Sequence, residues 1–282
     1  NYEPLLPGVI HLPAPFTYRT PFNTTDDAEI AAAIGRLFED EIAFQGADTI
    51  AALIVEPVLG AGGVIVPHET FLPLMREICD RHGILLIADE VITAFGRTGA
   101  WTGSRLWGVQ PDMMSTAKAI TNGYFPFGAV MISDKVAQVF ESNKGPLGSI
   151  GHGYTYSGHP VGAAAALATL KETKRLNVAD NAAARGEELL SGLKELQDKH
   201  ELVGDVRGKG LMCALELVSD RTKKSGAAKD VIQKVQDATY DAGVLVRTSG
   251  ANVIMSPPLI VTAENVQTML TALDAGLTAA RG

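Results

Sequence analysis

Three charged residues come at, or just after, the ends of short apolar runs in the sequence. Glu56 follows IAALIV, Asp89 ends ILLIAD, and Lys118 follows DMMSTA. Short continuous apolar runs are typical of parallel strands that are covered on both faces. In open α/β sheets, ligands gather at the carboxyl ends of such strands. We therefore expect the three residues to converge on one rim of a sheet. The alternative is a solvated charge at each strand end.

A lysine at such a rim has a specific chemical use. Partial burial of Lys118 would disfavour its ammonium form, lower its pKa and make it a nucleophile. A lysine that forms a Schiff base, paired with an acid that keeps a pyridine nitrogen protonated, is typical of pyridoxal phosphate (PLP) chemistry. Asp89 is the candidate acid. The cofactor phosphate needs backbone N–H groups and hydroxyls, which the stretch GHGYTYSG (151–158) offers.

The elements that must position these residues form a βαβ unit. Apolar residues at helical spacing, with acids at the start, predict a helix over 24–46. An amphipathic helix is expected at 68–83, and strands are expected at 50–57, 84–91 and 112–117. Strand, helix and strand at this spacing imply a parallel sheet. The proline-rich opening is expected to be extended connecting chain.

From about His159 the chain changes in character, because long helical patterns alternate with short strands. Helices are expected at 159–176, 178–200, 229–243 and 262–280, and strands within 203–219, 244–249 and 252–259. The predicted fold class is therefore α/β. A large domain with a mostly parallel sheet is expected over 1–169, and a smaller α+β domain over 170–282.

Composition limits the classes of protein to consider. The chain has 282 residues, of which 46% are apolar, and a net charge of −8. This length allows two domains, and the acidic balance argues against nucleic-acid binding. No apolar run reaches the roughly 18 residues of a membrane helix, and no signal peptide is visible. Cys79 and Cys213 are expected to be buried thiols without metal-ligand spacing. We expect a cytoplasmic enzyme.

Five segments occur in a characteristic order along the chain. They are VEPVLGAGG (55–63), ADEVITAFGRTG (88–99), PDMMSTAKAITNGYFPFGAV (111–130), HGYTYSGHPVGAAAAL (152–167) and VLVRTSGANVIMSPPL (244–259). Together they resemble class III aminotransferases, which are PLP enzymes of fold type I. The resemblance covers essentially the whole chain. It implies a transaminase that binds PLP and forms a homodimer with shared active sites.

The resemblance assigns the central roles to three residues. Lys118 would carry PLP as a Schiff base and then move a proton on the substrate. Asp89 would pair with the pyridine nitrogen and keep it charged. Val91 lies two residues further on and so on the same strand face. It would pack on the flat of the ring, the alternative being a plain core valine.

Other matching residues would complete the site. Thr155 would bind the cofactor phosphate from the neighbouring subunit. Glu56 would support the site, although a structural ion pair is an equal alternative. Tyr154 would border the pocket, although a packed aromatic is slightly favoured. The remaining motif residues and histidines are expected to be structural: Gly96, Arg97, Gly99, His82, His152 and His159.

Two departures from the family pattern bear on the substrate. Many members carry glutamine where this chain has Ile92, and isoleucine resembles the branch that transfers amino groups from ω-amino acids and amines to pyruvate. Ornithine and GABA aminotransferases have a glutamate at the position of Ala61, which neutralises an active-site arginine that matches Arg247. Without that partner, Arg247 can bind a carboxylate in a bidentate fork. Its alternative is a solvent-exposed charge at a strand end.

Members of the family are longer, and Lys118 comes early in this chain. A phosphate-binding Gly/Ser loop and a ring-stacking aromatic are expected upstream of Asn1. An exposed apolar surface is expected where that segment would pack. Three rivals remain beside the amine:pyruvate transaminase. The first is another PLP reaction, such as decarboxylation or an aminomutase step, and the second is an inactive fragment or pseudoenzyme. The third is a nucleotide-binding module, and the absence of any GxGxxG or P-loop pattern in this sequence argues against it.

Overall fold

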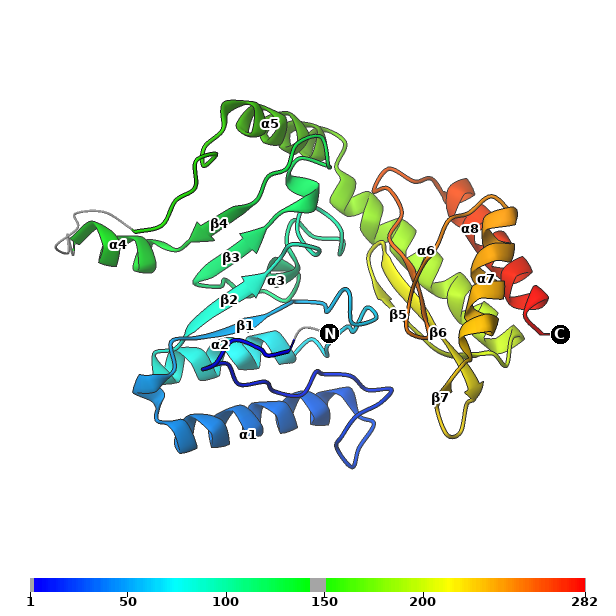
Figure 1. Ribbon diagram of the computed structural model, residues 1–282, viewed down its shortest axis with the longest axis horizontal. Helices are drawn as coiled ribbons and strands as arrows, with labels where there is room; N and C mark the ends of the chain where they lie inside the picture. The colour runs from blue at the N-terminus through cyan, green and yellow to red at the C-terminus, as the bar shows by residue number, and fades with distance from the viewer. Residues whose placement is uncertain (1–2, 143–150, 282) are drawn as a thin grey trace.

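The computed structural model describes residues 3–142 and 151–281, which contain two separate sheets (Figure 1). The first sheet has the order β1-β2-β3-β4. Three parallel strands, β1 (Ala52–Val55), β2 (Leu85–Asp89) and β3 (Met113–Thr116), are followed by the antiparallel edge strand β4 (Ala129–Ile132). The mostly parallel sheet is confirmed, and β4 was not predicted.

Two helices cover one face of the first sheet. In α1 (Asp27–Gln45), Asp26 caps the N-terminus by accepting a hydrogen bond from the N–H of Glu29 at 2.9 Å. The buried face of α1 packs on α2 (Phe71–His82), which ends at Gly83 in the left-handed conformation that glycine favours. Leu86 and Ala88 of β2 are fully buried on this side.

The opposite face of the first sheet is largely bare of described residues. Alternation along the strands places Ile54, Ile87, Met113 and Ile132 in one lateral row. The two outer members of this row, Ile54 and Ile132, are 62% and 42% exposed. The sequence predicted an exposed apolar surface, and this face is one.

The C-terminal half begins with the long helices α5 (Pro160–Arg175) and α6 (Val178–Lys199). The second sheet has the order β5-β6-β9-β8, with β7 paired to β6. Its strands are β5 (Val203–Lys209), β6 (Met212–Asp220), β7 (Ser225–Gly226), β8 (Arg247–Ser249) and β9 (Asn252–Met255). α6, α7 (Lys229–Asp241) and α8 (Ala263–Ala279) cover one face of it. The predicted domain boundary at 169/170 falls inside α5 and stays a prediction.

The other face of the second sheet meets the loops of the first half. Met212, Ala214 and Ile254 pack there against Val58 and Val64 in a small buried cluster. Shorter elements complete the described chain. They are α3 (Gly103–Leu106), α4 (Asp134–Ser142) and the 3-10 turns η1 (Ala47–Thr49) and η2 (Lys118–Ile120).

The loop 95–99 fastens the two halves together. The guanidinium of Arg97 donates to the carbonyl oxygens of Leu211 and Pro257, both at 2.7 Å. The N–H of Leu211 donates back to the Arg97 carbonyl at 3.0 Å. Burial lowers the pKa of Arg97 to about 10. The prediction that this loop is scaffold is consistent with these contacts.

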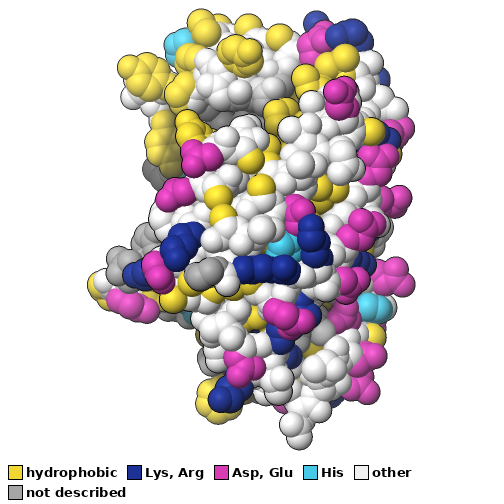
Figure 2. Space-filling model, turned by 90° about the vertical axis from the view of Figure 1, so that its right-hand side faces the viewer, with side chains coloured by type: hydrophobic (Ala, Val, Ile, Leu, Met, Phe, Trp, Pro, Cys, Tyr) yellow, Lys and Arg dark blue, Asp and Glu magenta, His cyan; other side chains and the backbone are white. Residues whose placement is uncertain are grey.

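The surface charges and the burial of the two cysteines agree with what the composition indicates. Figure 2 shows acidic and basic side chains interspersed over the C-terminal helices, without a field of one sign. Among the described residues, no helix is long and apolar enough to cross a membrane. Cys79 and Cys213 are buried free thiols, as predicted, and burial raises their pKa values to about 11 and about 12.

Candidate active site

The register of the first sheet brings the predicted residues to one rim. Val55 pairs with Ala88 and Asp89 pairs with Ser115, so Glu56 and Asp89 end neighbouring strands at the same level. Lys118 follows Ser115 by three residues. The carboxyl ends of β1, β2 and β3 therefore lie at one rim of the sheet.

Asp89 lies on the bare face of the sheet, because its neighbours Leu86 and Ala88 alternate with it into the covered face. One carboxylate oxygen, Oδ1, accepts the N–H of Val91 at 3.1 Å and the hydroxyl of Ser115 at 3.3 Å. Among the described residues, no hydrogen bond reaches Oδ2. The carboxylate is therefore oriented by its own chain and keeps an acceptor for a further donor.

Two expectations for neighbouring positions need correction. Lys118 was expected to be partly buried at a strand end, but β3 stops at Thr116, and Lys118 is exposed at the first position of η2. Its φ is +43°, in the left-handed region that non-glycine residues seldom adopt. Val91 lies beyond the end of β2, so strand alternation does not direct its side chain.

Glu56 contacts its own chain in this structure. Its carboxylate accepts the N–H of Gly60 at 2.9 Å, and the Gly60 carbonyl in turn accepts the N–H groups of Gly63 and Val64. A side chain on Gly60 would collide with Ile92, whose Cδ1 lies 2.3 Å from the ideal Cβ position. Glu56 thus fixes the tight loop that carries Ala61.

Sequence reasoning missed the role of Glu90, which is completely buried. Its carboxylate accepts the hydroxyl of Thr93 and the N–H groups of Gly103 and Ser104, the last two at 2.7 and 2.6 Å. These bonds satisfy the free N–H groups at the start of α3. The available signal was an acid at the end of an apolar strand with a Thr-Gly-Ser helix start twelve residues later.

The predicted phosphate and pocket residues lie on the segment before α5. Thr155 is exposed, and Tyr154 is 74% exposed with its ring edge against His152. His159 caps the N-terminus of α5, and His82 lies 2.7 Å from Glu39. No hydrogen bond between described residues joins Thr155 to Asp89 or Lys118.

Arg247 lies on the second sheet, on the face that meets the first half. It pairs with Ile254, which is one of the residues packed against the loops after β1. Arg247 is exposed, and none of the ion pairs between described residues includes it. Two residues further on, the Ser249 hydroxyl donates to the carbonyl of Ala61 at 3.3 Å. The loop of Ala61 and the strand of Arg247 are therefore in contact.

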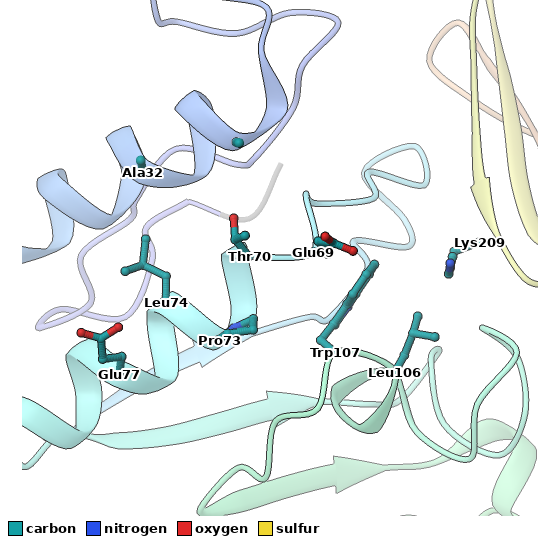
Figure 3. Close-up of a pocket in the computed structure, with 10 residues that line it drawn as sticks. Ala32, Glu69, Thr70, Pro73, Leu74, Glu77, Leu106, Trp107 and Lys209 are labelled. Carbon is teal, nitrogen blue, oxygen red and sulfur yellow. The ribbon is translucent and has the colours of Figure 1, made fainter.

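One cavity lies away from this rim. Its volume is about 810 Å³, and it lies between α1, α2, α3 and Lys209 (Figure 3). Trp107 lines this cavity, and the Nζ atom of Lys209 lies 5.8 Å from the centroid of the Trp107 ring. None of the predicted site residues lines this cavity, so it is not the rim described above.

A mostly parallel sheet with an acid at one strand end and a lysine just after the next strand, joined to a second antiparallel sheet that carries an arginine, is consistent with fold type I PLP enzymes. The chain matches the family Aminotransferase class-III over residues 1–277. It therefore belongs to that family.

Several curated proteins that are similar to this chain are aminotransferases. A putrescine–pyruvate aminotransferase of Pseudomonas aeruginosa is 38% identical over 94% of this chain and 58% of its own length. A taurine–pyruvate aminotransferase of Bilophila wadsworthia is 35% identical over 99% of this chain and 62% of its own length. A mitochondrial γ-aminobutyrate transaminase of Oryza sativa is 38% identical over 94% of this chain and 51% of its own length.

Solved structures agree on the fold. An amine transaminase from an uncultivated Pseudomonas species, in the PLP-bound form, is 47% identical with a TM-score of 0.96 over 99% of this chain and 63% of that one. An (S)-enantioselective ω-transaminase from Thermomicrobium roseum is 40% identical, with a TM-score of 0.93 over 100% of this chain and 62% of that one. The chain thus spans about three fifths of the length of these relatives.

The residues present fit PLP. The ring of PLP needs a carboxylate at its nitrogen, and Asp89 offers Oδ2 for that bond. The aldehyde needs an accessible amine, and Lys118 is exposed near the same rim. Asp89 and Lys118 could hold the two ends of the ring.

Proposed function

We propose that this chain forms the greater part of a PLP-dependent transaminase, which moves an amino group from an ω-amino acid or primary amine to pyruvate and yields alanine. The observation that carries the proposal is the pairing of Asp89 on β2 with Ser115 on β3, three residues before Lys118, in a chain of the class III family. Relatives that act on putrescine and taurine with pyruvate support the substrate class.

The proposed roles follow from the chemistry of each side chain. Bound PLP supplies an electron sink for the carbanion formed at the substrate Cα. Asp89 holds the ring nitrogen and, as an anion, favours its protonated form. Lys118 would hold the cofactor, and its amine would carry the proton to and from the substrate Cα as a general base and acid. Val91 packs on the ring.

The acceptor preference rests on Arg247 and Ala61. Arg247 has no acid partner among the described ion pairs, and the residue facing its hairpin from the loop after β1 is alanine. Its guanidinium can therefore bind the carboxylate of pyruvate in a bidentate fork. Tyr154 borders the pocket in this proposal, and Glu56 supports it through the loop of Gly60.

The proposal includes a homodimer with shared active sites. Thr155 is exposed, and in this proposal its hydroxyl binds the cofactor phosphate of the neighbouring subunit. We further propose a cytoplasmic location and two domains, 1–169 and 170–282.

The test uses the full-length protein and a panel of amines with pyruvate, with alanine as the measured product. Lys118→Ala should lower turnover by about 100- to 10,000-fold, because the general base is lost. Arg247→Ala should raise the KM for pyruvate roughly 10- to 100-fold, since bonds to a charged group are removed. Release of CO₂ without alanine would instead show a decarboxylase, and absence of any turnover would favour a pseudoenzyme.

A further inference from the structure

The second sheet presents two lateral rows of side chains to the loop 59–65. Strand pairing places the members of each row side by side, and alternation turns both rows toward this loop. The first row is Arg207, Ala214, Ile254 and Arg247, and the second row is Asp205, Glu216, Asn252 and Ser249. The candidate carboxylate-binding arginine thus ends a row that begins with another arginine.

Arg207, in the first row, contacts the loop and the second row at once. Its Nε donates to the carbonyl of Gly63 at 2.7 Å, and Nη1 donates to Asp205 at 2.6 Å and Glu216 at 3.1 Å. Its Nη2 donates to the side-chain oxygen of Asn252. The side chain is only 11% exposed. A planar fork of donors can make all four bonds, whereas a lysine ammonium has three donors at a single point.

These bonds form part of a closed circuit between the loop and the β8–β9 hairpin. Asn252 donates to the carbonyl of Ser249 at 3.1 Å, and Ser249 donates to the carbonyl of Ala61 at 3.3 Å. Gly63 closes the circuit with φ +113°, and a Cβ there would lie 2.9 Å from the Asn252 amide nitrogen and 3.0 Å from Arg207. Only glycine fits this approach.

The same network gives the two arginines different ion pairing. Glu216 is 4% exposed, and its two oxygens bind Arg19 and Arg207. Asp205 also binds Arg207. Arg207 is therefore neutralised by two acids, whereas Arg247 shares its sheet face without an ion pair among the described residues.

We propose that Arg207 and Asn252 are positioning residues. They hold the hairpin of Arg247 at a fixed distance from the loop of Ala61, and so set the affinity for the substrate carboxylate. Small displacements of a binding group have large effects on a bidentate contact. The inference rests on the proposed function, in which Arg247 binds pyruvate.

The primary test is Asn252→Ala in the full-length holoenzyme. This change cuts the hairpin from Arg207 and leaves the buried Arg207–Glu216 pair intact. The KM for pyruvate should rise about 3- to 10-fold, since hydrogen bonds that orient Arg247 are lost. The KM for a donor amine without a carboxylate, and kcat, should stay within about twofold. Arg207→Lys should raise the pyruvate KM at least as much.

Gln236→Ala is the matched control. Gln236 also makes two hydrogen bonds to the strand of Arg247, one from Thr248 and one to the Val246 carbonyl, but from α7 and not from the loop. Its pyruvate KM should change by less than about twofold. Hydrogen exchange should accelerate in both 59–65 and 247–254 in Asn252→Ala, but not in 59–65 in Gln236→Ala.

The outcomes separate the two proposals. If Arg247→Ala leaves the pyruvate KM unchanged, the proposed function is wrong in its acceptor site. If Arg247→Ala raises that KM and a folded Asn252→Ala does not, only the positioning inference is overturned. Equal rises in the KM values for pyruvate and amine would also overturn it, because they would show general damage to the site.

Discussion

Asp89 and Glu90 are adjacent carboxylates with opposite surroundings. Asp89 lies on the bare face of the sheet with one oxygen unused by the described chain, whereas Glu90 is buried and accepts three hydrogen bonds. The first arrangement suits a ligand, and the second suits an anchor. Glu90 fixes the end of β2 against α3, and so holds the backbone from which Asp89 projects.

The identity of residue 61 should control how Arg247 is used. In Ala61→Glu, the new carboxylate would face the hairpin of Arg247 and pair with it. The KM for pyruvate should then rise roughly tenfold or more, because the arginine is occupied. The measurement is the steady-state KM for pyruvate at a fixed amine concentration.

Ala61→Gln is the control for this change, because it adds the same bulk without charge. Its pyruvate KM should rise far less than that of Ala61→Glu. Equal effects of glutamate and glutamine would show that volume, not charge, determines binding at this loop.

At the scale of single residues, the sequence pointed to Asp89, Lys118 and Arg247 as candidates through their places after apolar runs and within matching segments, and their roles stay predictions. It could not supply the exposure of Lys118, which depends on where β3 ends and on which chain covers the rim. The contacts of Glu56, Glu90 and Arg207 were also out of reach. Glu56 and Glu90 bind backbone N–H groups of loops that have no regular period, and Arg207 binds side chains that only the strand register brings near.

At the scale of elements, the covered strands and long helices were predicted within a few residues, since each has a clear hydrophobic period. β4 was missed because it is a four-residue edge strand that follows a glycine- and proline-rich loop, and three of its residues are exposed. The end of β2 at Asp89 was also missed, because the apolar pattern continues to Val91 although the chain has turned.

Asp112 anchors the start of β3, and its ionisation makes the stability of the first sheet depend on pH. Its carboxylate binds Arg76 at 2.7 Å and the N–H of Leu86 at 2.8 Å. Burial alone would raise the pKa of Asp112, but the N–H of Leu86, Arg76 and Lys135 together lower it below its ordinary value. The stabilisation is therefore complete above the unfolded pKa of about 3.9 and is lost as pH falls through the lower folded value.

Asp112→Asn should consequently destabilise the protein by about 1–3 kcal/mol at pH 7. The difference from the parent should shrink below about pH 4, as the parent's own carboxyl becomes protonated. Urea unfolding between pH 3 and pH 7 measures both effects. A difference that stays constant over this range would show that the charge of Asp112 contributes nothing.

At the scale of the whole molecule, the junction between the halves depends on glycine. Gly210 has φ +56°, and a Cβ there would lie 2.4 Å from the Thr98 carbonyl carbon and 2.6 Å from the Arg97 oxygen. Gly210→Ala should therefore cost about 3–5 kcal/mol, as backbone strain and a collision add together. Denaturant unfolding measures this loss.

Gly250→Ala separates strain from collision. Gly250 has φ +57°, almost the same as Gly210, but nothing lies within 4 Å of its ideal Cβ. This variant should lose only about 1–2 kcal/mol. Similar losses in the two variants would show that the contact between 95–99 and Gly210 does not hold the halves together.

Within residues 1–282 taken alone, the bare face of the first sheet leaves the two halves unequally protected against heat. The second sheet is covered on one side by three helices and on the other by the loops of the first half, whereas Ile54 and Ile132 face solvent. Both tryptophans of the chain, Trp101 and Trp107, lie in the less protected half. On heating residues 1–282, tryptophan emission should change several degrees before the helical circular dichroism signal falls. A fluorescence change that coincides with the loss of helix would show that the chain melts as one cooperative unit.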